Sequence, residues 1–217
     1  MTSSFIDPAI WEYCLAHTSR QSTSLEQLKK ATYAQVHGAQ MLSETMVGQL
    51  MHFFVEALQP NVLVDVGTYT GLSALVMAEA SPWNAKVYTI DRPGQAGRQL
   101  AEQAIRQHHE GQKITCVEQN ASDWLSTFDQ AIDFAFIDAD KKQVLTYFNV
   151  ILERLSDRGM IMIDDVLWRG QVLDPENDPR GQAMDQLNQV IVNHPDLHNM
   201  LLPIRHGMQI VQKIQSK

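Results

Sequence analysis

The chain has 217 residues, of which 44% are hydrophobic and 19% are charged. This composition is globular, and the length suits one domain with a sizeable core, so we expect a single domain over residues 1–217. The formal net charge of −8 argues against a nucleic-acid partner or an anionic membrane surface, because phosphate groups are bound by basic surfaces.

The two cysteines, Cys14 and Cys116, are far apart and fit no metal-ligand spacing. They indicate a reduced, cytoplasmic protein. The first ten residues lack the basic start and apolar centre of a signal peptide, and no apolar run is long enough to cross a bilayer. The expected location is therefore the cytoplasm, without membrane attachment.

A helical extension is predicted over residues 1–58. Asp7 followed by Pro8 is typical of a helix start, and residues 24–27 show a capping-box pattern that opens a second helix. An apolar, helix-period stretch over 44–58 predicts a third. These helices are apolar enough to cover a crevice or to form a dimer contact, and we expect a homodimer.

After residue 58, short apolar runs alternate with helical patterns, and two further strand-like segments, 197–203 and 207–213, end the chain. The five apolar runs are Val62–Val66, Lys86–Ile90, Lys113–Val117, Ile132–Ile137 and Gly159–Ile163. Near-continuous apolar strands separated by helices indicate a doubly wound α/β fold, a parallel sheet covered on both faces. In such sheets ligands bind beyond the carboxyl ends of the strands. The pair His108-His109 is expected on a solvated helix face.

The first strand ends in an acid, one residue, and then the spacing G-x-x-x-G, with Asp65, Gly67 and Gly71. A dinucleotide site would instead show G-x-G-x-x-G. Asp91, at the end of the second strand, offers a carboxylate to ribose hydroxyls, and Ala121 follows the third strand, where an adenine ring would lie. With Asp65 facing an amino group, the set suits S-adenosylmethionine; the alternative is an ordinary strand–turn–helix.

Acids also follow the fourth and fifth predicted strands. Asp138 ends one, and Asp164 and Asp165 end the other, so their oxygens are placed to share one hard cation such as Mg²⁺. A cation there would lower the pKa of a substrate hydroxyl, and Lys141 could take the proton. The alternative is that Asp138 or Asp140 only caps the helix beginning near Lys141, and that Asp164 and Asp165 are loop residues.

These residues carry a resemblance to the caffeoyl-CoA O-methyltransferase family, which is related to catechol O-methyltransferase. The similarity runs over nearly the whole chain and is most specific in Phe134–Lys141 and Asp164–Trp168. It implies a Rossmann-like S-adenosylmethionine methyltransferase fold, with a mostly parallel seven-stranded sheet whose last strand is antiparallel.

The resemblance also implies roles for particular residues. Lys141 and Asp138 would be catalytic, Trp168 would line the substrate pocket, and the metal ligands would be Asp138, Asp164 and Asp165. The implied cofactor-binding residues are Met41, Ser43, Asp65, Gly67, Ser73, Asp91, Ala121 and Asp138.

The chain departs from the family pattern in three places. Asp165 stands where the family usually has Asn, and Asp65 replaces the commoner Glu. Arg205-His206-Gly207 stands where the family usually has Gly-Asp-Gly.

The sequence therefore predicts an enzyme, a metal-dependent O-methyltransferase that acts on one hydroxyl of a catechol-like small aromatic molecule. Its cofactors would be S-adenosylmethionine and Mg²⁺ or another divalent cation. Two alternatives stay open: a methyltransferase of a hydroxylated tRNA base, and a cofactor-binding protein that has lost catalysis, suggested by Asp165 and by Arg205 with His206.

Overall fold

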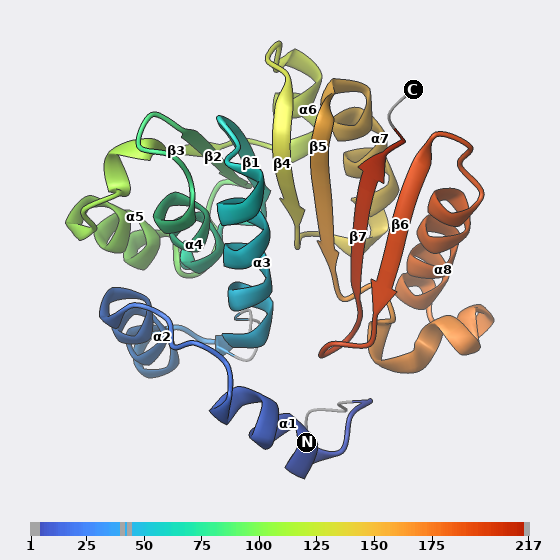
Figure 1. Ribbon diagram of the computed structural model, residues 1–217, viewed down its shortest axis with the longest axis horizontal. Helices are drawn as coiled ribbons and strands as arrows, with labels where there is room; N and C mark the ends of the chain where they lie inside the picture. Colours follow the sequence, from blue (N-terminus) through green and yellow to red (C-terminus); the bar gives the residue numbers. More distant parts are fainter. Residues whose placement is uncertain (1–4, 40–41, 43–44, 215–217) are drawn as a thin grey trace.

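One seven-stranded sheet runs through the protein, in the strand order β3-β2-β1-β4-β5-β7-β6 (Figure 1). The computed structural model describes residues 5–39, 42 and 45–214. The strands are β1 Val62–Val66, β2 Lys86–Asp91, β3 Ile114–Glu118, β4 Ile132–Ile137, β5 Leu155–Asp164, β6 Leu197–Leu202 and β7 Met208–Lys213. Strands β1 to β5 pair in parallel, and β7 is antiparallel to both of its neighbours, β5 and β6. The predicted sheet, mostly parallel with an antiparallel last strand, is confirmed.

Alternate residues of each strand face opposite layers of helices. In β4, Phe134 and Phe136 pack with α2, α3, α4 and α5, whereas Ala135 and Ile137 pack with α6, α7 and α8. The helices after β1 are α4 Leu72–Ala80, α5 Arg98–Gln107, α6 Ala121–Thr127, α7 Val144–Arg154 and α8 Pro179–Val192. Short 3₁₀ turns are η2 Gly111–Lys113, η3 Lys141–Gln143, η4 Trp168–Leu173 and η5 Pro175–Asn177. Burial of both sheet faces explains why the strands are apolar at nearly every position.

The N-terminal part is helical, as predicted, with α1 Pro8–Ala16, α2 Thr23–Gln35 and α3 Thr45–Leu58. The predicted start of α2 was wrong: Ser22, rather than Ser24, is the N-cap and accepts a hydrogen bond from the backbone N–H of Leu25 at 3.3 Å. Helices α2 and α3 contribute buried residues to the core, whereas α1 has none. Among the described residues, no helix has the length and apolarity needed to cross a membrane.

The turn after β1 is pressed against the end of β4. Gly67 has φ +115°, a conformation that favours glycine, and its N–H donates to the carbonyl of Ile90 at 2.9 Å. The N–H of Asp138 donates to the carbonyl of Val66 at 2.9 Å. A Cβ atom on Gly67 would lie 2.2 Å from the carbonyl oxygen of Asp138. The absence of a side chain at Gly67 therefore keeps this turn in contact with the segment that follows β4.

Replacement of Gly67 by alanine should be much more costly than the same change at Gly94. Gly94 also has positive φ (+76°), but nothing lies within 4 Å of a Cβ atom there. We expect Gly67→Ala to lower the free energy of unfolding by about 3 kcal/mol or more, and Gly94→Ala by about 1 kcal/mol. Urea denaturation of both variants measures the difference, and equal losses would contradict a steric role for the contact with Asp138.

Candidate active site

The carboxylate of Asp65 is fully buried beneath the glycine turn. Its Oδ2 accepts hydrogen bonds from Ser73 Oγ at 2.9 Å and from Thr89 Oγ1 at 2.7 Å. Its Oδ1 has no hydrogen-bond partner within the described part of the chain. Burial raises the pKa of Asp65 to about 7, against the lowering effect of the two hydroxyl groups. An unsatisfied buried acceptor of this kind fits a cationic group of a ligand, such as the amino group of S-adenosylmethionine.

Asp91 and Ala121 lie at the carboxyl ends of β2 and β3, as predicted. The two oxygens of Asp91 accept hydrogen bonds from the backbone N–H groups of Tyr69 (3.1 Å) and Arg92 (2.9 Å). A carboxylate accepts up to about four hydrogen bonds, so Asp91 retains capacity for hydroxyl donors. Ala121 is the first residue of α6 and is buried in the core. The predicted residues Met41 and Ser43 lie outside the described residues.

The three predicted metal-binding aspartates converge around Lys141, from the ends of the neighbouring strands β4 and β5. Lys141 Nζ donates to Asp138 Oδ1 at 2.8 Å and to the carbonyl oxygen of Asp164 at 3.3 Å. It also lies 3.4 Å from Asp165 Oδ2. The capping alternative applies to Asp140 instead, whose Oδ1 accepts from the N–H of Lys142 at 3.1 Å.

A further residue of this cluster, Arg205, was not predicted as a site residue. It lies in the turn between β6 and β7, and its Nη1 is 3.1 Å from Asp164 Oδ2 and 3.6 Å from Asp165 Oδ1. The antiparallel pairing of Asp164 with Met208 brings this turn beside the end of β5. Sequence comparison pointed to Arg205 only as a departure from the family pattern, because the contact depends on the register of a strand far along the chain.

The carboxylates and the two cations shift one another's ionisation. Burial alone would lower the pKa of Lys141, but the charges of Asp138, Asp165 and Asp164 raise it well above its ordinary value. Burial, with repulsion from Asp138 and Asp165, raises the pKa of the Asp164 carboxyl. In this arrangement Lys141 is a firmly protonated ammonium group rather than a base.

The donor atoms of the cluster fit a hard divalent cation in their chemistry. All three side chains offer carboxylate oxygens, and Asp165 Oδ1 is buried without a hydrogen-bond partner among the described residues. Their placement is less complete, because no three His, Cys, Asp or Glu side chains in the described ranges are gathered closely enough to hold a metal ion. Lys141 and Arg205 contact the carboxylate oxygens that a bound cation would use.

Trp168 follows the cluster by less than one helical turn. Its N–H donates to the carbonyl of Asp165 at 2.9 Å, and its φ of +41° marks a tight turn. The indole Nε1 lies 3.4 Å from Asp178 Oδ2, and the guanidinium of Arg180 lies 5.5 Å from the ring centroid. The ring is half-buried at the start of the loop 168–178, a place suited to contact with an acceptor molecule.

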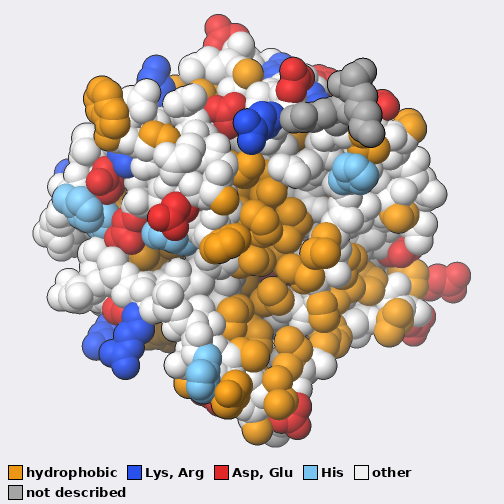
Figure 2. Space-filling model, viewed as in Figure 1, with side chains coloured by type: hydrophobic (Ala, Val, Ile, Leu, Met, Phe, Trp, Pro, Cys, Tyr) orange, Lys and Arg blue, Asp and Glu red, His pale blue; other side chains and the backbone are white. Residues whose placement is uncertain are grey.

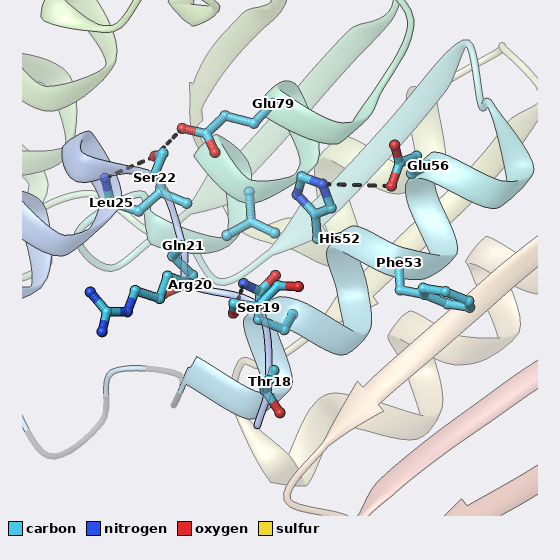
Figure 3. A pocket seen from close by; sticks show the side chains of 12 residues that line it. Thr18, Ser19, Arg20, Gln21, Ser22, Leu25, His52, Phe53, Glu56 and Glu79 are labelled. Atoms are coloured by element: carbon cyan, nitrogen blue, oxygen red, sulfur yellow. Dashed lines mark hydrogen bonds and ion pairs between the residues drawn. The ribbon is translucent and has the colours of Figure 1, made fainter. Parts of the chain in front are cut away.

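A cavity of about 310 Å³ is at a different place, between residues 18–25 and helices α3 and α4 (Figure 3). Glu79, at the far end of α4 from the glycine turn, accepts from Ser22 Oγ at 2.5 Å and lies 2.9 Å from His108 Nε2. The prediction of a solvated His108 was therefore wrong, although its neighbour His109 is exposed. The cavity contains none of the predicted site residues, so the strand ends are the better candidate site.

The sheet order, the glycine turn after β1 and the acidic strand ends define an S-adenosylmethionine-dependent methyltransferase. A family model described as O-methyltransferase matches residues 15–214, and the chain belongs to this family. This match confirms the resemblance to the O-methyltransferase family that the sequence motifs indicated.

Similar proteins agree with this assignment. A mouse protein named catechol O-methyltransferase domain-containing protein 1 is 31% identical, over 96% of this chain and 81% of its own. A caffeoyl-CoA O-methyltransferase from Stellaria longipes is 26% identical, over 90% of this chain and 85% of its own. The solved structure of a Podospora anserina methyltransferase with bound SAH has a TM-score of 0.87 at 23% identity, covers 95% of this chain and 94% of its own, and supports the fold.

The buried Asp65 should make stability depend on pH. Its folded-state pKa, about 7, is above its ordinary value of 3.8, so its contribution to stability is present below pH 4 and is lost as pH rises through 7. From pH 5 to pH 8 the stability of Asp65→Asn relative to wild type should rise by about 2–3 kcal/mol. Urea denaturation at both pH values tests this, with the exposed Asp157→Asn as control; an equal difference at both would contradict it.

Proposed function

We propose that this enzyme transfers the methyl group of S-adenosylmethionine to one hydroxyl of a catechol-like vicinal diol, with a divalent cation such as Mg²⁺ held by Asp138, Asp164 and Asp165. One observation carries the proposal: carboxylates from two neighbouring strand ends meet around Lys141. The names of two relatives, which contain catechol and caffeoyl-CoA O-methyltransferase, support a catechol-like acceptor.

Most of the residues proposed to bind the cofactor lie at the ends of β1, β2 and β3, whereas the proposed metal ligands lie at the ends of β4 and β5. The turn at Gly67 and Ser73 at the start of α4, with the carboxylates of Asp65 and Asp91, would hold the amino-acid and ribose parts of the cofactor. The first turn of α6 at Ala121 would border the adenine. Contact between Gly67 and Asp138 makes the two halves of the site adjacent. Met41, Ser43 and a cofactor contact from Asp138 stay predictions within this proposal.

When bound, the cation would supply Lewis acidity that lowers the pKa of the diol hydroxyls and fixes their oxygens. A bound cation would also change the pKa of Lys141. Its pKa is raised by three carboxylates and lowered by burial. With the carboxylate charge compensated by the cation, burial would be the main influence on the pKa of Lys141 and would lower it, so that its amine could accept the hydroxyl proton of the acceptor. Trp168 would pack against the aromatic ring of the acceptor.

Loss of Lys141 should abolish most of the activity, whereas loss of its exposed neighbour Lys142 should not. We expect Lys141→Ala to reduce kcat by about 100-fold or more, the usual contribution of a positioned base, and Lys142→Ala to leave it nearly unchanged. The assay follows methyl transfer from labelled S-adenosylmethionine to caffeic acid and other catechols, with Mg²⁺ and with excess chelator.

Retained S-adenosylmethionine binding would show that Lys141→Ala is folded. Full activity of this variant would contradict the role of Lys141, and full wild-type activity in chelator would contradict the metal. Tight cofactor binding without transfer to any tested diol would favour a protein that has lost catalysis, or an acceptor of another kind.

We also propose that the chain forms a homodimer. Helix α1 is apolar yet has no buried residue, with Ile10 56% and Tyr13 63% exposed. Phe53 on α3 and Met200 on β6 are also exposed, at 67% and 59%. Figure 2 shows an apolar area over α3 and the neighbouring strands, toward the α1 end of the molecule. An apolar surface of this kind is typical of a subunit contact.

A charge in this apolar surface should dissociate the dimer. We expect Phe53→Glu to shift the protein to monomer because a buried, unpaired carboxylate opposes association. Trp83→Glu, at an 87% exposed position between α4 and β2, serves as the matched control and should leave the mass unchanged. Sedimentation equilibrium measures the mass; a monomeric wild type, or a dimeric Phe53→Glu, would contradict this interface.

A further inference from the structure

A guanidinium group occupies part of the carboxylate cluster. Arg205 is only 8% exposed, and its Nη1 lies 3.1 Å from Asp164 Oδ2 and 3.6 Å from Asp165 Oδ1. These oxygens belong to two of the three side chains proposed to hold the cation. Because an arginine keeps its proton at all accessible pH values, this positive charge cannot be removed by titration.

The turn that carries Arg205 is fixed to the segment after β5. The N–H of Leu167 donates to the carbonyl of His206 at 2.8 Å, and the N–H of Val166 donates to the carbonyl of Gly207 at 3.1 Å. Arg205 itself has φ +53°, a left-handed conformation that is unfavourable for a residue with a Cβ atom. The chain therefore places a long cationic side chain at a position where glycine would suit the backbone better.

Arg205 offsets part of the negative charge of the carboxylate cluster. Asp138, Asp164 and Asp165 together carry three negative charges, and Lys141 with Arg205 supplies two positive ones. A divalent cation would bring the same two charges to the same oxygens. The guanidinium would repel this cation, and the cation would have to displace it from Asp164. Without Arg205, only Lys141 would offset the three carboxylates, and their larger net negative charge would attract a cation more strongly.

We infer that Arg205 competes with the divalent cation for Asp164 and Asp165, and so holds the metal affinity of this enzyme below what its three carboxylates would otherwise give. The inference rests on the proposed metal site. Arg205 is a positioning residue for the carboxylates in the metal-free protein, and its movement off Asp164 accompanies metal binding.

Binding of Mn²⁺ to the full chain, followed by electron paramagnetic resonance of the free ion, tests this directly. We expect Arg205→Gly, which also suits the backbone at φ +53°, to bind Mn²⁺ about tenfold more tightly than wild type or better. Arg205→Gln removes the same charge and should act in the same direction, so it decides the question if the glycine variant does not fold. Arg205→Lys retains the charge and should stay closer to wild type.

Arg169→Gln is the matched control. Arg169 is exposed in the adjoining loop and forms no ion pair with the three aspartates within the described residues, although its charge reaches His206. Its loss should leave Mn²⁺ affinity nearly unchanged. An equal gain from Arg169→Gln would show that net charge alone, rather than competition by Arg205, sets the affinity, and would overturn the inference.

The inference is also overturned if neither charge-removing variant binds Mn²⁺ more tightly than wild type, including the case in which none of the proteins binds it. This failure is distinct from failure of the proposed function. A wild-type enzyme that needs metal for methyl transfer, with Arg205→Gly no tighter for Mn²⁺, refutes only the competition. A wild type fully active in chelator refutes metal-dependent catalysis, whatever the affinities.

Discussion

The arrangement of the whole site depends on the compensation of carboxylate charge at one edge of the sheet. Asp65 and Asp164 are fully buried, and Asp138 and Asp165 are mostly so. Buried charges without partners are very costly, so each is tied to donors that the fold must supply: hydroxyl groups for Asp65, and Lys141 with Arg205 for the others. The last two strands are part of this solution, because β7 brings the arginine turn beside β5.

The carboxylates at this edge of the sheet are stabilised in two ways, by neutral hydroxyl groups at Asp65 and by cationic side chains at Asp138, Asp164 and Asp165. Neutral hydroxyl donors satisfy only one oxygen of Asp65 within the described part of the chain, and burial raises the pKa of this carboxyl to about 7. Both features suit a ligand that brings its own positive charge. In the neighbouring cluster, the positive charges of Lys141 and Arg205 offset most of the negative charge of Asp138, Asp164 and Asp165. Gly67 lies between the two halves of the site, and its contact with the carbonyl of Asp138 makes the distance between them a property of the backbone rather than of mobile side chains. Methyl transfer needs such a fixed distance between donor and acceptor.

The sheet and the convergence of the acids could be predicted from the sequence because both follow from local patterns. Buried parallel strands are apolar throughout, and residues that end such strands meet at one edge. What could not be predicted depends on contacts between distant segments. Ser22 rather than Ser24 caps α2, while Ser24 lies 3.1 Å from His108 Nε2, so a buried network across three segments overrides a local capping pattern. Arg205 likewise enters the site only through the register of β7 with β5.

The same contact accounts for two departures from the family pattern that had no connection in the sequence. Aspartate in place of asparagine at 165 adds a negative charge, and arginine in place of glycine at 205 adds a positive one. In the structure these two side chains are 3.6 Å apart, Arg205 Nη1 to Asp165 Oδ1. At 206 a histidine whose pKa is lowered by burial stands where the family usually has Asp, so this change removes a negative charge and provides no positive partner for Asp165. The extra carboxylate of Asp165 is therefore balanced within the protein by Arg205, and the changes at 165 and 205 together form an ion pair.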